Sequence, residues 1–81
     1  MMILSNKQLY DAVKETADGL EGLGMKDQAD ELRAALSISS LPGEILGEIR
    51  LALQRIDLRV LPKVTEYQIV SEITYIDSVL G

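Results

Sequence analysis

Three carboxylates in the N-terminal quarter of the sequence are the first candidates for chemistry. Asp11, Glu15 and Asp18 recur at intervals of four and three residues, so they form one row along a helix. Paired carboxylates act as general acid and base only where burial raises the pKa of one of them. The row lies opposite the apolar stripe of the same helix, so we expect it to face water and not to catalyse.

The residue types that most often supply catalysis or metal binding are absent from the sequence. The 81 residues include no His and no Cys, which excludes disulfides, thiolate chemistry and the commonest zinc ligands. A second acidic group, Asp27, Asp30 and Glu31, lacks the spacing of a calcium loop and suits the positive end of a helix dipole. We therefore predict no catalytic residue, no metal and no cofactor.

Nucleic-acid and membrane binding are disfavoured by charge and by segment length. The formal net charge is −5, whereas phosphate binding requires an excess of basic residues. A helix-turn-helix would place Glu44 and Glu48 at the start of its recognition helix, where they would repel phosphates. No apolar run approaches the roughly 20 residues of a membrane span. We expect a soluble, cytoplasmic protein.

Apolar residues spaced by three and four positions predict four amphipathic helices. We place these helices at about 6–23, 26–36, 41–57 and 65–80. Short connections make each consecutive pair an antiparallel αα-hairpin, with Gly24 as the left-handed cap between the first two helices. The expected fold is all-α, with the two αα-hairpins packed into a small bundle that forms a single domain over residues 1–81.

Hydroxyl residues mark the expected helix starts. Ser5 with Gln8, and Thr65 with Gln68, each have the spacing of a capping box, in which the hydroxyl accepts from a backbone N–H and the Gln reaches back. Ser40 is the expected N-cap of the third helix. These signals specify helix boundaries and carry no information about activity.

The surplus of apolar residues is the main functional clue. Hydrophobic residues make up 47% of the chain, and Leu51, Leu58, Tyr75 and Val79 lie off the main apolar stripes of their helices. Either the bundle wraps these side chains inside the monomer, or they contact another chain. The second interpretation predicts a non-catalytic helical protein-interaction module that binds itself or a heterologous protein. We expect a homo-oligomer or a subunit of a bacterial or phage assembly.

An alternative function depends on charge. The row Asp11, Glu15 and Asp18 could mimic nucleic acid and block a basic site on a target protein, as an immunity or anti-defence protein would. Binding of this kind would weaken strongly with salt, whereas leucine-dependent association would not. The basic stretch at residues 50–63 could meet an acidic partner, although solvated arginines near a helix C-terminus explain it as well.

Overall fold

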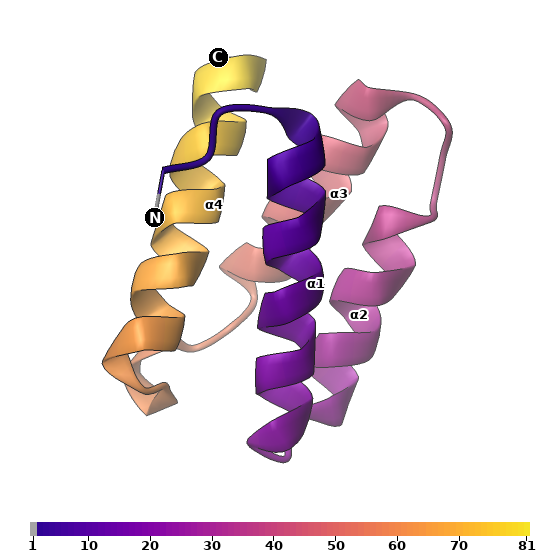
Figure 1. Cartoon of the computed structure of the whole chain (residues 1–81). Helices are drawn as coiled ribbons and strands as arrows, with labels where there is room; N and C mark the ends of the chain where they lie inside the picture. Colours follow the sequence, from indigo (N-terminus) through magenta and orange to yellow (C-terminus); the bar gives the residue numbers. More distant parts are fainter. Residues whose placement is uncertain (1) are drawn as a thin grey trace.

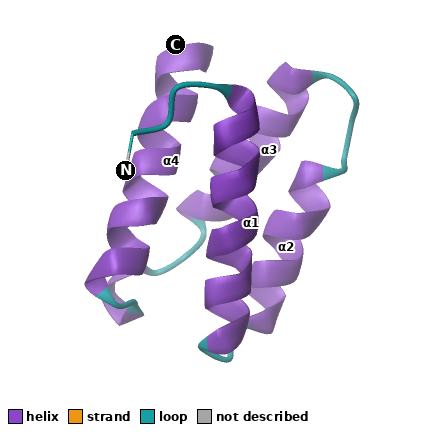
Figure 2. Ribbon diagram, viewed as in Figure 1, coloured by secondary structure: helices purple, strands orange, loops and turns teal. Residues whose placement is uncertain are grey.

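The computed structural model describes residues 2–81 and is all-helical over that range, as expected (Figures 1 and 2). In chain order the elements are α1 (Asn6–Gly22), α2 (Lys26–Leu36), α3 (Pro42–Gln54), the short 3-10 helix η1 (Leu58–Val60) and α4 (Lys63–Leu80). The main contacts run from α1 to α2, α2 to α3, α3 to α4 and α4 back to α1. The two αα-hairpins thus close into a four-helix bundle.

The first helix starts and stops as the sequence predicts. The N–H of Gln8 donates to Ser5 Oγ at 3.2 Å, and Gln8 Oε1 accepts from the N–H of Leu4 at 2.8 Å. This pair satisfies two backbone donors, although the Gln reaches the residue before the cap and not the cap itself. Gly24 follows the helix with φ of 83°, a conformation that glycine adopts without steric cost.

The predicted cap of the last helix is wrong. Helix α4 begins at Lys63, two residues earlier than expected, with Pro62 as the N-cap residue and no side-chain cap. The first turn closes when the N–H of Glu66 donates to the Pro62 carbonyl at 3.0 Å, so Thr65 already lies inside the helix. Gln68 does not reach back either, because its Nε2 donates to the carbonyl of Ala12 on α1 at 3.1 Å.

The start of the third helix also differs from the prediction at one residue. Leu41, not Ser40, is the N-cap residue, and Pro42 follows at the first helical position, where its missing N–H costs nothing. Ser39 Oγ accepts from the N–H of Leu41 at 3.0 Å and donates to Glu44 Oε1 at 2.6 Å. The hydroxyl that orders this helix start is therefore one residue earlier than expected.

The third helix is shorter than predicted. It ends at Gln54, and the chain then turns through η1, where the Asp57 carboxylate accepts from the N–H of Arg59 at 3.0 Å. Leu58 therefore lies in η1 and is no part of an extended third helix. Pro62 prevents this segment from continuing directly into a longer helix.

The apolar stripes of all four helices meet in one core. Its most completely buried members include Leu9, Val13, Ala17, Leu20, Ala29, Leu32, Leu46, Ile49, Leu53, Ile69 and Ile76. Ahead of α1, the N-terminal segment crosses the end of the bundle from α4 to α1 (Figure 1), and its Ile3 is also buried. No helix within residues 2–81 is long and apolar enough to cross a membrane.

Candidate functional site

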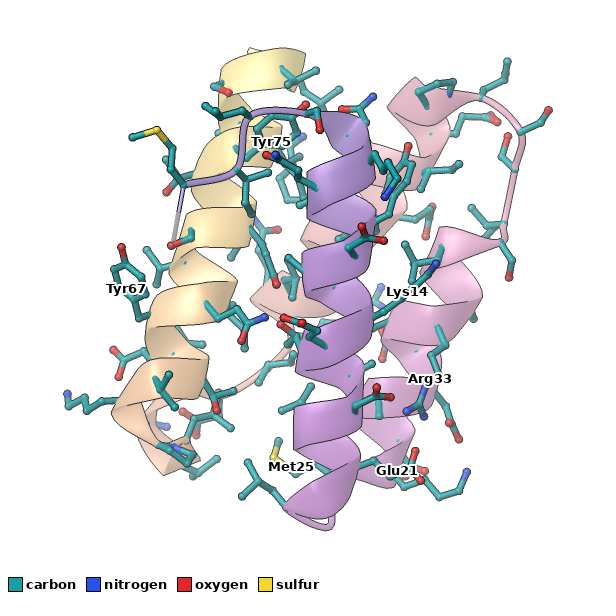
Figure 3. All side chains as sticks on the ribbon, viewed as in Figure 1. Lys14, Glu21, Met25, Arg33, Tyr67 and Tyr75 are labelled. Carbon is teal, nitrogen blue, oxygen red and sulfur yellow. The ribbon has the colours of Figure 1, made fainter. Side chains whose placement is uncertain are left out.

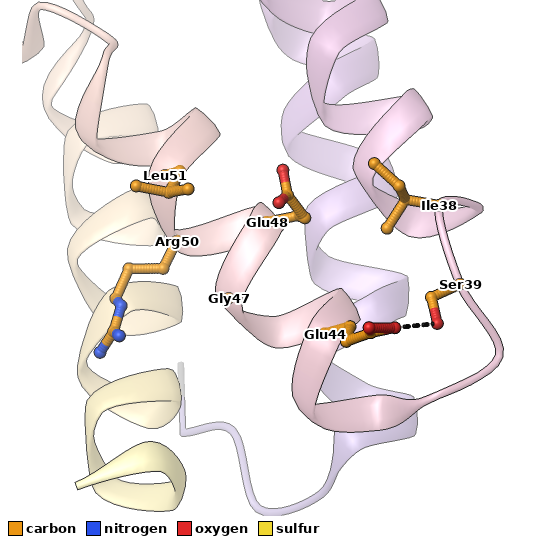
Figure 4. Close-up of a pocket in the computed structure, with 7 residues that line it drawn as sticks. All are labelled: Ile38, Ser39, Glu44, Gly47, Glu48, Arg50 and Leu51. Atoms are coloured by element: carbon orange, nitrogen blue, oxygen red, sulfur yellow. Dashed lines mark hydrogen bonds between the residues drawn. The ribbon is translucent and has the colours of Figure 1, made fainter.

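A shallow groove of about 470 Å³ lies on the outer side of α3 and the loop before it (Figure 4). We call this surface the α3 groove; it is lined by Ile38, Ser39, Glu44, Gly47, Glu48, Arg50 and Leu51. Two apolar side chains are accessible in it, since Leu51 is 47% exposed and Ile38 is 57% exposed. An exposed apolar hollow with a charged rim is typical of a protein-binding surface.

Two glycines on α3 are not required by the packing of the monomer. A Cβ atom added at Gly43 or Gly47 would meet no other atom within 4 Å. Glycine inside a helix costs about 0.5–1 kcal/mol relative to alanine. The open space beside Gly47 would allow a second helix to approach the α3 groove closely.

Charge along the outer face of α3 is divided by sign. The acids Glu44 and Glu48 lie in its N-terminal part, and Arg55 follows immediately after its last residue. Glu48 also lines a smaller hollow next to the groove together with Arg55. Arg55 is paired with Glu31 of α2, but its side chain remains 66% exposed and is therefore accessible to a partner.

The four residues predicted to contact a partner do not form one patch. Leu51 is 47% and Val79 is 51% exposed, whereas Leu58 and Tyr75 are half-buried against the core. Tyr75 projects toward the N-terminal segment (Figure 3), and its hydroxyl donates to Asn6 Oδ1 at 2.6 Å. Of the four, only Leu51 lines the α3 groove.

The predicted acidic row is exposed but largely paired within the chain. Asp11 bonds to Lys7 Nζ at 3.0 Å, and Asp18 bonds to Arg33 Nη2 at 2.8 Å. Arg33 also bonds Glu21, close to it at the bottom of the α1–α2 pair (Figure 3), and these carboxylates raise its pKa. The net negative field of this surface is therefore weaker than the sequence suggests.

A buried carboxyl group is the feature that the sequence analysis missed. Glu72 of α4 is fully buried, and its Oε2 accepts from Thr16 Oγ1 of α1 at 2.7 Å. Its Oε1 has no hydrogen-bond partner among the residues that the structure describes. The sequence spacing could have predicted the burial of Glu72, because this residue lies three positions after Ile69 and four before Ile76, on the stripe that packs inward.

The environment of Glu72 favours its neutral form. Burial is the main cause and raises the pKa of Glu72 to about 7, with the negative charge of Glu15 acting in the same direction. The hydrogen bond from Thr16 opposes this rise but does not cancel it. A carboxyl group that titrates near neutral pH can act as a proton donor or acceptor, but this one has no access to solvent.

A second hollow lies between the N-terminal segment and α4 and contains no charged side chain. It is lined by Met2, Ile3, Tyr67, Val70, Ser71, Thr74, Tyr75 and Ser78. Val70 is 46% exposed there, almost the same fraction as Leu51 in the α3 groove. This hollow lacks the separated charges of α3, so it offers a partner fewer features for orientation.

Neither metal binding nor a relationship to known proteins provides a further guide to function. Within residues 2–81, no group of three or more His, Cys, Asp or Glu side chains could hold a metal ion. Comparisons with protein families, with curated proteins and with solved structures gave no match to this chain. The α3 groove and the buried carboxyl group of Glu72 are therefore the features of this molecule that point to a function.

Proposed function

We propose that this protein is a non-catalytic helical interaction module that associates with a second copy of itself through the α3 groove. The observation that carries the proposal is the exposure of Leu51 at 47% beside Gly47, on a face whose acidic and basic residues are separated along the helix. A leucine in a shallow groove is a suitable anchor for an interface, and glycine permits close helix packing.

An antiparallel two-fold arrangement fits this face. If two α3 helices cross near Leu51, the N-terminal half of each helix lies against the C-terminal half of the other. Glu48 of one copy then lies near Arg55 of its partner, and the same contact recurs on the other side of the axis. The charges that would repel in a parallel pair attract in this one, so two copies with a net charge of −5 each can associate.

A charge exchange tests the arrangement. We expect Glu48→Arg and Arg55→Glu each to weaken self-association about tenfold, because each places like charges across the interface. The double variant carries both changes in every copy and should recover most of the affinity. Sedimentation equilibrium measures the self-association constant of the two single variants and of the double variant. Additive losses without recovery would contradict the antiparallel pairing.

The change at Arg55 requires a control, because this residue also bonds Glu31 within the chain. We expect Glu31→Gln to leave self-association unchanged, because exposed ion pairs contribute little to stability. A loss in this control as large as that in Arg55→Glu would assign the effect to the monomer fold and not to the interface.

The alternative function, inhibition of a basic target protein by the acidic row, has less support than self-association. Of the three residues of the row, only Glu15 has no ion pair among the contacts described above, so the surface offers a basic target less charge than expected. Binding to a basic protein that disappears between about 50 and about 500 mM salt, and survives a Leu51→Glu change, would favour this function over self-association.

A further inference from the structure

Glu72 is the only residue among 2–81 whose buried side chain leaves a polar atom without a partner. The carboxyl group lies at the contact between α4 and α1, and its single hydrogen bond comes from Thr16. A buried carboxylate with one donor is strongly destabilised, whereas a neutral carboxyl group at the same place costs much less. The protonation state of Glu72 therefore affects how firmly these two helices hold together.

Among residues 2–81, no basic group compensates a negative charge on Glu72. From α1 the facing groups are the hydroxyl of Thr16 and the carboxylate of Glu15, which repels such a charge. From α3, Arg50 reaches α4, but it is bound to Asp77 at 3.0 Å. Side chains 2–4 of the N-terminal segment, which crosses the top of this contact, are uncharged.

The charged groups of α4 itself are also engaged elsewhere. Glu66 pairs with Lys63 at 3.6 Å in the first turn, and Asp77 pairs with Arg50 near the C-terminus. Glu72 takes part in no ion pair with any other residue of the described range 2–81. Ionisation would thus place an uncompensated charge in the middle of the α1–α4 contact.

Three side-chain hydrogen bonds span the contact between these helices. In addition to the Thr16–Glu72 bond, Gln68 Nε2 donates to the Ala12 carbonyl, and the Tyr75 hydroxyl donates to Asn6. Water can replace each of these bonds when the helices separate. Separation of α4 from α1 therefore need not leave these polar groups unpaired.

We propose that the α1–α4 contact is a proton-dependent latch, which a proton on Glu72 keeps closed and which weakens as that proton passes to solvent. Opening lets the carboxylate reach water and exposes the inner face of α4, including Ile69 and Ile76. The pKa of about 7 in the closed state, against 4.5 for the exposed group, makes opening easier as pH rises between these values. This inference does not depend on the proposed self-association.

Amide hydrogen exchange, corrected for intrinsic rates, tests the latch residue by residue. We expect the protection of α4 amides to fall about 40-fold between pH 5 and pH 7 and to level off above about pH 8. At each pH, α4 should be less protected than α2, which makes none of the main contacts with α4. In Glu72→Gln the fall should disappear, while the control Glu66→Gln should keep it.

Three results would contradict the proposal that the α1–α4 contact is a proton-dependent latch. Equal protection in α2 and α4 at every pH would mean that the whole molecule opens at once. An unchanged fall in Glu72→Gln would assign the pH dependence to other groups. The third result comes from carbon-13 NMR of the unaltered protein, which follows the titration of the Glu72 side-chain carboxyl directly. A midpoint near 4.5 for that carbon in the unaltered protein, where the latch requires about 7, would remove its basis.

Discussion

At the residue scale, the pKa of Glu72 links pH to the stability of the whole fold. The pKa of Glu72 is about 7 in the folded protein and 4.5 when its carboxyl group is exposed, so the folded state binds this proton more tightly. The free energy of unfolding should therefore fall as pH rises from about 4.5 to about 7, and stay level above that. The difference between these pKa values corresponds to about 3 kcal/mol, a large fraction of the stability of a small domain.

Urea unfolding of the unaltered protein and of Glu72→Gln, compared at each pH, isolates this contribution. We expect the two proteins to have similar stability near pH 4.5, and the variant to be more stable by up to about 3 kcal/mol at pH 8. Groups other than Glu72 cancel in the comparison. A stability difference that does not change with pH would show that Glu72 titrates normally.

A second prediction at this scale compares Ser5, which caps α1, with Thr65, which has the same sequence pattern but caps no helix. Ser5 accepts from the N–H of Gln8, so Ser5→Ala should lower the free energy of unfolding by about 1 kcal/mol. Thr65 lies inside α4 and caps nothing, so Thr65→Ala should cost clearly less, which chemical denaturation can measure. Equal losses in the two variants would contradict the observed start of α4.

At the element scale, Gly47 should affect the monomer and its association in opposite directions. A Cβ at this position has open space, so Gly47→Ala should stabilise the monomer by about 0.5–1 kcal/mol through helix propensity. The same methyl group would hold a second α3 helix further away and weaken self-association. Thermal unfolding at low concentration and sedimentation equilibrium measure the two effects.

The matched control for Gly47 is Gly19 of α1, which is also helical and where an added Cβ would also meet open space. Gly19→Ala should give the same stabilisation and leave association unchanged. If both variants weaken association equally, or if neither does, Gly47 has no special role in the interface.

Sequence patterns predict the helices of this chain better than they predict the helix caps. Apolar spacing of three and four predicts the four helices and their two hairpins, because that spacing directly reflects which side of a helix packs inward. The capping box at Ser5 is predictable because it is local, but the same pattern at Thr65 fails. There, Pro62 starts the helix earlier, and Gln68 bonds to a distant carbonyl on α1.

The candidate site is harder to predict than the fold. Leu51 can be found because it lies off the apolar stripe, and it is exposed. Tyr75 meets the same criterion, but it is half-buried, and its hydroxyl donates to Asn6 at the start of α1. The α3 groove depends on Ile38 from the preceding loop, and no periodic pattern specifies where a loop residue will lie.

At the scale of the whole molecule, an 81-residue bundle has a small interior relative to its surface. The apolar side chains that it cannot bury come from every helix and from the connecting segments. The α3 groove differs from the other faces because exposed leucine, helical glycine and separated charges occur together there. Self-association through this face would cover apolar surface that the single chain leaves in water.

The most direct test of the central claim is the solution mass of the protein across a concentration series from about 1 µM to about 1 mM, a range that covers weak and moderate affinities. We predict a reversible rise from 8.9 kDa toward twice that mass in the unaltered protein. Leu51→Glu should remain at the monomer mass, while Val70→Glu, a matched change at an equally exposed residue, should behave like the unaltered protein. A constant mass of 8.9 kDa at every concentration, or equal loss of association in both variants, would contradict the account.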